Sequence, residues 1–253
     1  MNFFKKIFIG NSDIIMGKKP RSAIYTQVNN VKAVWDSKKY EDFGIERVLR
    51  LFLVCIQFVF PGLYIRDLSG RINTLTRKVC NEIYVIAKII LYLFFLFVFR
   101  THSWYSFVCA YLIFETFCYL SGLIFLNTEY KNAASYRRNL LMAIINFVEI
   151  TLGFASIYYC SFKGLIKELE TPIDAIYFSF ISATTVGYGE MHPITACSKF
   201  VCVTQSFASF LFAVFIISVF LSNLNKTGFL NDAKKQSEAQ VKTESNVNNS
   251  IHN

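Results

Sequence analysis

The stretch that decides the fold of this chain is Thr184-Thr185-Val186-Gly187-Tyr188-Gly189, which lies between two long apolar segments. Its two glycines have no Cβ and take positive φ angles at little cost. An alternation of ordinary and left-handed residues turns successive backbone carbonyl oxygens toward a common axis. Four copies around that axis would form rings of oxygens that can replace the water shell of a bare cation. The stretch therefore predicts a cation-binding loop built from backbone carbonyls.

The residues on either side of this loop strengthen the prediction. A helix-length run from Pro172 to Ala183 precedes it, and Pro172 suits a helix N-terminus because its fixed φ fits the first turn. Roughly 20 mostly apolar residues follow the loop, which is enough to cross a bilayer. Gly-Tyr-Gly alone would usually be a turn, and the alternative interpretation is a glycine-rich loop between two membrane helices without a conduction role.

Residues 139–224 resemble the pore module of the potassium channel superfamily, in which an outer helix, a pore helix, a selectivity filter and an inner helix follow one another. The resemblance implies K⁺ as the permeant ion, coordinated at Thr185, Val186, Gly187 and Tyr188, with no cofactor. It also implies that the side chains of Val186 and Tyr188 point away from the pore and brace the loop. Because the motif occurs once, a closed pore needs three further copies of the chain or close relatives.

Two positions near the loop depart from the family pattern. Glu190 follows the loop where the family usually has Asp. A ring of Glu190 side chains would concentrate cations at the outer mouth, and the resemblance implies Tyr177 as the hydrogen-bond partner of this carboxylate. Ile181 stands where some members of the family have a carboxylic acid, so that acid-to-acid contact is absent here.

The inner helix also departs from the pattern. Many members have a hinge glycine in its middle, and Ser209 occupies that position in this chain. No glycine lies between residues 190 and 227. We therefore expect gating in the filter, or at a hydrophobic constriction formed by Phe220, Leu221 and Leu224, and not at a glycine hinge.

His192 lies two residues beyond Glu190, at the predicted outer mouth. Four copies there could sense pH, because an ordinary imidazole titrates near pH 6.5. The alternative is an exposed loop histidine that has no effect on conduction.

The composition indicates an all-α polytopic membrane protein. The mean hydropathy is +0.39, 54% of the 253 residues are hydrophobic, and only 17% are charged. Lipid requires each backbone polar group to be satisfied within the segment, which favours helices. The net charge of +9 is better explained by basic loops on the inner side of a membrane than by nucleic acid. The seven cysteines show no metal-binding spacing.

The apolar segments predict four transmembrane helices, at 83–99, 104–126, 139–162 and 197–223, with a re-entrant pore helix at 172–183. Within the membrane region 48–138, residues 51–65 are short and broken by Pro61-Gly62, which predicts an interfacial or re-entrant segment. Residues 1–47 form a basic N-terminal segment, and residues 225–253 are expected to be a disordered tail.

The distribution of basic residues indicates the orientation. With the filter outside, segments 1–47, 66–82, 127–138 and 224–253 are cytoplasmic, and they hold 20 of the 26 Lys and Arg residues. This bias follows the positive-inside rule and predicts that both termini are cytoplasmic. We expect the protein to lie in the plasma membrane.

Three charged residues, Lys88, Glu115 and Glu149, fall inside predicted spans. Ionisable groups there are often functional, but pairing between helices or snorkelling is the interpretation that we favour. No segment carries Arg or Lys at every third position, so we expect no steep, sensor-driven voltage gating. No catalytic motif is found, and we expect no enzyme.

Three alternatives to a potassium-selective channel remain open at this point. A weakly selective cation channel would follow if Glu190 loosens the filter, although Tyr188 argues against this. A potassium-uptake transporter subunit is disfavoured because those chains resemble four fused pore modules. A modulatory subunit of a heteromeric channel is disfavoured by the intact filter.

Overall fold

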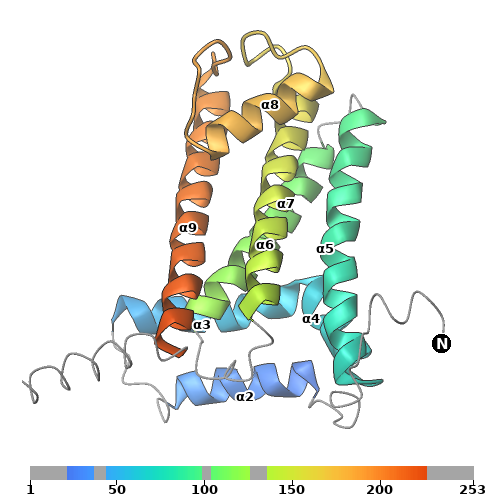
Figure 1. Cartoon of the computed structure of the whole chain (residues 1–253), viewed down its shortest axis with the longest axis vertical. Coiled ribbons are helices and arrows are strands. Elements are labelled where there is room, and N and C mark those ends of the chain that lie inside the picture. Colours follow the sequence, from blue (N-terminus) through green and yellow to red (C-terminus); the bar gives the residue numbers. More distant parts are fainter. Residues whose placement is uncertain (1–21, 37–43, 99–103, 126–135, 227–253) are drawn as a thin grey trace, which may run out of the picture.

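The computed structural model describes residues 22–36, 44–98, 104–125 and 136–226, and these form helices and connecting loops. Four long helices stand side by side (Figure 1): α5 (Thr74–Phe97), α6 (Trp104–Phe125), α7 (Tyr136–Phe162) and α9 (Ala196–Lys226). At one end of this group lies the short helix α8 (Pro172–Ala183). At the opposite end lie α2 (Ala23–Trp35), α3 (Ile45–Ile56) and α4 (Pro61–Gly70). Residues 225–226 of the predicted disordered tail belong to α9, and residues 227–253 lie outside the described residues.

Three of the described helices are long and apolar enough to cross a membrane, over Thr74–Phe97, Leu140–Phe162 and Ala196–Ile217. The fourth predicted span is the helix α6, whose 22 residues correspond to about 33 Å, the thickness of a bilayer core. Its length and its place among the long helices are those of the predicted span. The first predicted span begins earlier than expected, at Thr74 rather than at residue 83.

The apolar segment around residues 51–65 is bent and not straight. The helix from Ile45 to Val59 and the helix α4 meet at an angle of 71°. Pro61 opens α4 and cannot continue the preceding helix, because it has no backbone N–H and its ring clashes with the preceding turn. The N–H of Gly62 donates instead to Glu115 Oε1 of α6, at 2.8 Å. Figure 1 shows α3 and α4 lying across the ends of the long helices.

The helix α2 was not expected from the sequence, which indicated only a basic N-terminal segment. Ser22 caps this helix, accepting a hydrogen bond from the N–H of Tyr25. Asp67 of α4 accepts from the N–H of Ala23 at 2.8 Å and from the Ser22 hydroxyl. The Ser22 hydrogen bond lowers the pKa of Asp67. A carboxylate at a helix N-terminus is stabilising. The carboxylate that stabilises the start of α2 belongs to α4, a different part of the chain.

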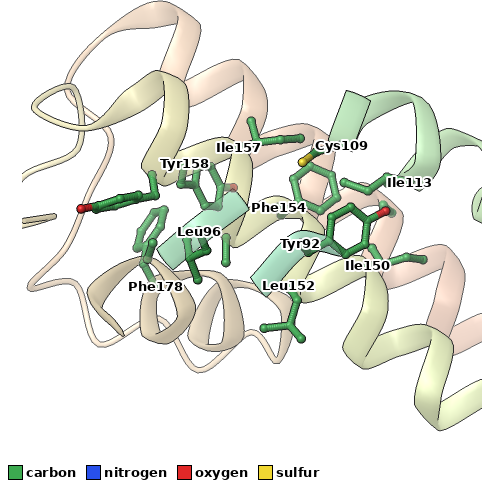
Figure 2. Close-up of a cluster of buried hydrophobic side chains, with 14 of the residues drawn as sticks. Tyr92, Leu96, Cys109, Ile113, Ile150, Leu152, Phe154, Ile157, Tyr158 and Phe178 are labelled. Atoms are coloured by element: carbon green, nitrogen blue, oxygen red, sulfur yellow. The ribbon is translucent and has the colours of Figure 1, made fainter. Parts of the chain in front are cut away.

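The helix α7 is central, since it packs against α5, α6, α8 and α9. Figure 2 shows side chains from four of these helices in one apolar cluster. Gly153 lets α6 approach closely, because a Cβ at this position would lie 2.8 Å from two side-chain atoms of Ile113. The labelled members of the cluster in Figure 2 are Tyr92, Leu96, Cys109, Ile113, Ile150, Leu152, Phe154, Ile157, Tyr158 and Phe178.

Candidate ion-conduction site

The pore helix α8 has the bounds that the sequence predicts, Pro172 to Ala183. Its N-terminus is closed by a capping box, in which the N–H of Asp174 donates to Thr171 Oγ1 at 3.2 Å. In return, the N–H of Thr171 donates to Asp174 Oδ2 at 2.6 Å. Such a cap satisfies N–H groups that a helix start leaves unbonded. It holds the start of α8 in place before the chain turns into the loop.

The backbone of the loop alternates in the manner that the sequence predicts. The φ angles are 61° at Thr185, 50° at Gly187 and 86° at Gly189, while Val186 and Tyr188 have negative φ. The two glycines were expected in the left-handed region, and Thr185 was not. A residue with a branched side chain rarely takes such an angle. The strained conformation of Thr185 extends the alternation to five consecutive residues.

The N–H groups of the loop face the pore helix. Val186 N and Gly187 N donate to the carbonyl of Ile181, at 3.0 and 3.3 Å, and Thr185 N donates to the carbonyl of Ser182 at 3.3 Å. Within the described part of the chain, no hydrogen bond is donated to the carbonyl oxygens of Val186, Gly187 or Tyr188. The last turn of α8 therefore holds the loop by its donors and leaves these acceptors available.

Tyr177 braces the outer end of the loop. Its hydroxyl donates to the carboxylate of Glu190, which is the partner that the family resemblance implies. This hydrogen bond raises the pKa of Tyr177 to about 12. The ring of Tyr177 stacks on Tyr188 with 6.5 Å between centroids and 3° between planes. Tyr188 and Val186 are otherwise 70% and 52% exposed in the described part of a single chain.

The remaining predicted residues lie apart from these contacts. His192 is exposed, and its carbonyl accepts a hydrogen bond from Lys167 N at 2.9 Å. Ser209 is buried within α9, and Ile181 is buried in α8. The side chains of Phe220, Leu221 and Leu224 fall outside the described residues, so the constriction stays a prediction.

A buried network behind the pore helix was missed at the sequence level. The Tyr158 hydroxyl of α7 donates to Gln205 Oε1 of α9 at 2.6 Å. Gln205 Nε2 donates to the carbonyl and the hydroxyl of Ser179 in α8, at 2.8 and 2.9 Å. The Ser179 hydroxyl donates to the carbonyl of Thr151 at 2.7 Å. The available signal was a glutamine inside an apolar inner helix, where polar groups need partners.

The charged residues inside the predicted spans are paired, as the favoured interpretation expected. Lys88 Nζ of α5 lies 3.0 Å from Glu149 Oε1 of α7, and it donates to Thr116 Oγ1 of α6 at 2.5 Å. Glu115 accepts from the Tyr84 hydroxyl at 2.6 Å. These contacts join α5, α6 and α7 around two carboxylates.

Part of the chain is similar to known ion channels. Residues 146–226 match the ion channel family. A 92-residue part of the chain is 29% identical to "Potassium voltage-gated channel subfamily A member 5" of Mus musculus and to "Potassium voltage-gated channel subfamily A member 4" of Homo sapiens. It is 30% identical to "Potassium voltage-gated channel subfamily A member 2" of Oncorhynchus mykiss. Each match covers 36% of this chain, and 15%, 14% and 19% of the respective relatives.

No solved structure matches the chain. The family match lies within the C-terminal half of the chain and includes α8, the filter loop and α9. This part of the chain is a pore module of the potassium channel superfamily, carried by an integral membrane protein with at least three apolar helices of spanning length.

Proposed function

We propose that this protein is a potassium-selective channel in which four copies of the chain surround one pore. The observation that carries the proposal is the alternating backbone at Thr185, Gly187 and Gly189, which leaves the intervening carbonyl oxygens without hydrogen-bond donors among the residues that the structure describes. Oxygens in this state are ready to take the place of water around a cation. One chain supplies one side of such a cage, and three more copies complete it.

In this proposal each part of the site has a separate role. The carbonyls of residues 185–188 coordinate K⁺ in successive rings, so that an entering ion expels one ahead of it. Glu190 gathers cations at the outer mouth and is held by Tyr177. The pore helix supports the loop through Ile181 and Ser182. Neither a metal nor an organic cofactor takes part, and the transported K⁺ is the only ligand.

The arrangement of the helices supports the proposed orientation. The filter loop lies at one end of the long helices, and α2, α3 and α4 lie at the other (Figure 1). With the filter outside, the basic N-terminal part of the chain lies on the cytoplasmic side, as the positive-inside rule requires. The plasma membrane is the site of action that we propose, with both termini in the cytoplasm.

The proposal is tested by ion flux through the purified protein in liposomes, with K⁺ replaced by Na⁺. The matched variant is Gly187→Ala, because a Cβ is strained at φ 50° even though nothing lies within 4 Å of it. We expect a reversal potential that follows the K⁺ gradient in the native protein and is lost in the variant. Equal passage of Na⁺ and K⁺ would instead identify a weakly selective cation channel.

The pH response tests His192 separately. If this residue senses pH, conduction changes between about pH 8 and pH 5.5, the range over which an ordinary imidazole titrates. The His192→Ala variant would not show this change. Identical responses in both proteins would assign His192 to an exposed loop position without a role.

A further inference from the structure

The buried network behind the pore helix joins three helices by hydrogen bonds. It contains Gln205 of the inner helix α9, Ser179 of the pore helix α8, and Tyr158 and Thr151 of the outer helix α7. Gln205 and Ser179 are 0% exposed. All their partners therefore come from within the protein, and each lost contact leaves a polar group unsatisfied.

The chemistry of the partners fixes the orientation of the Gln205 amide. The carbonyl of Ser179 can only accept, so the NH₂ group of Gln205 must face it, 2.8 Å away. The amide oxygen then faces Tyr158, whose hydroxyl supplies the proton at 2.6 Å. Gln205 thus donates to one helix and accepts from another, in a single arrangement.

The network is one step from the filter loop. Ser179 lies two residues before Ile181, whose carbonyl accepts from the N–H groups of Val186 and Gly187. On the inner helix, Gln205 lies four residues, about one turn, before Ser209. A shift of the inner helix near Ser209 therefore reaches the pore helix through Gln205, and the filter through the last turn of the pore helix.

We infer that Gln205 is a positioning residue, which makes the K⁺ affinity of the filter depend on the position of the inner helix. The inference rests on the proposed function, since it assumes that the loop binds K⁺. Through Gln205, a shift of the inner helix would affect the filter even though this helix lacks a glycine at the hinge position.

The test measures how K⁺ protects the purified full-length tetramer against heat, with K⁺ raised from about 1 to about 150 mM in exchange for Na⁺. A ligand that binds only the assembled state raises its melting temperature by mass action. This readout needs no open pore, so a channel that is closed in vitro still gives an answer.

The variants are Gln205→Leu and Ser179→Ala, with Ser156→Ala as the matched control. Ser156 is also 0% exposed and also donates to another helix, at the carbonyl of Tyr92 in α5, 3.0 Å away. Within the described part of the chain, its hydroxyl donates to the carbonyls of Tyr92 and Leu152, and neither residue lies in the pore helix. Ser179→Ala and Ser156→Ala therefore remove the same hydroxyl from two equally buried positions.

We expect half-maximal protection to need about tenfold more K⁺ in Gln205→Leu and about threefold more in Ser179→Ala, the scale of one buried hydrogen-bond partner. Ser156→Ala should melt earlier at every K⁺ concentration but keep the native half-maximal value. Native values in the first two variants, or an equal shift in Ser156→Ala, would overturn the inference alone. Absence of K⁺ protection in the native tetramer, or of a tetramer, would overturn the proposed function as well.

Discussion

The two faces of α7 hold their neighbours by different chemistry. On one face, Glu149 pairs with Lys88 of α5 and accepts from Thr116 of α6. On the other, the carbonyl of Thr151 accepts from Ser179 of the pore helix. These two α7 residues are two positions apart, about 200° around the helix. The contacts of α7 with α5 and α6 thus include a buried ion pair beside neutral hydrogen bonds such as that from Ser156 to Tyr92. The described contact with the pore helix is a neutral hydrogen bond.

The difference has an energetic consequence. A buried charge that loses its partner is costly, whereas replacing both members of a pair by neutral groups is often tolerated. A neutral network loses less when one member is removed. Removal of one partner from the ion pair with α5 should therefore cost most of the stability that this contact provides. Removal of one partner from the contact with the pore helix should cost only a part of it. This predicts that the peripheral helices set the stability of the chain, while the pore module can be adjusted in small steps.

The largest effect is expected from Lys88→Met. This variant leaves the carboxylate of Glu149, which is 0% exposed, without a counter-charge, and it should destabilise the protein by about 3–5 kcal/mol. The double variant Lys88→Met/Glu149→Gln should recover most of the loss, because the amide oxygen still accepts from Thr116. Thermal unfolding in detergent measures the stability of the native protein, of Lys88→Met and of the double variant. A double variant no more stable than Lys88→Met would show that the contact does not act through charge.

The second effect concerns the bend between α3 and α4. Glu115→Leu removes the acceptor for the N–H of Gly62 and for the Tyr84 hydroxyl. Both donors are half-buried, so the loss should be about 1 kcal/mol for each, at the low end for a donor that is left unsatisfied. Amide hydrogen exchange at residues 60–64 is the direct measurement, and exchange there should accelerate. Tyr84→Phe is the control, since it removes one donor but leaves the acceptor of Gly62 in place.

A smaller effect is expected in the neutral network. Tyr158→Phe removes the donor to Gln205 Oε1 and keeps the aromatic contact with Phe178, whose ring lies 5.1 Å away. The expected cost is about 1 kcal/mol, measured by the same unfolding experiment. A loss as large as that in Lys88→Met would remove the distinction between the two faces of α7.

The smallest effect is expected at the cap of α2. The lowered pKa of Asp67 means that its carboxylate stabilises the fold above its ordinary pKa of 3.8. The contribution is lost as pH falls through the lowered value in the folded state. Asp67→Asn should cost about 0.5 kcal/mol at neutral pH, the low end of the range for a helix cap, because the amide oxygen still accepts, and it should abolish this part of the acid response. Limited proteolysis within residues 22–36 reports the release of α2, and an unchanged cleavage pattern would contradict the assignment.

Much of the pore module could be predicted because its signals are local. Pro172, the glycines of the loop and the apolar runs act through their own backbone and their neighbours in sequence. The Tyr177–Glu190 contact came from the family resemblance and spans 13 residues. The break at Pro61 was also predicted from a local signal, and the structure bends by 71° there.

The rest depends on contacts between distant residues, which a single sequence does not reveal. The partners Lys88 and Glu149 are 61 positions apart, and Ser179 and Gln205 are 26 apart. A buried polar residue shows that a partner must exist, but its identity depends on how the helices pack. The helix α2 was missed for the same reason, since Asp67, which accepts from Ser22 and Ala23 at its N-terminus, lies 44 residues beyond Ala23. The left-handed Thr185 was missed because a branched residue disfavours this conformation.

The pairing of Lys88 with Glu149 also constrains how the chain is made. Helices enter the bilayer in order of synthesis, and α5 leaves the ribosome before α7 exists. A lone lysine within a span is costly in lipid, so α5 is less stable in the bilayer by itself than beside α7. We expect α5 and α6 to remain bound to the insertion machinery until α7 has been synthesised, and to enter the bilayer together with α7. Biogenesis of the pore module would then be coupled to correct insertion of the helices that precede it.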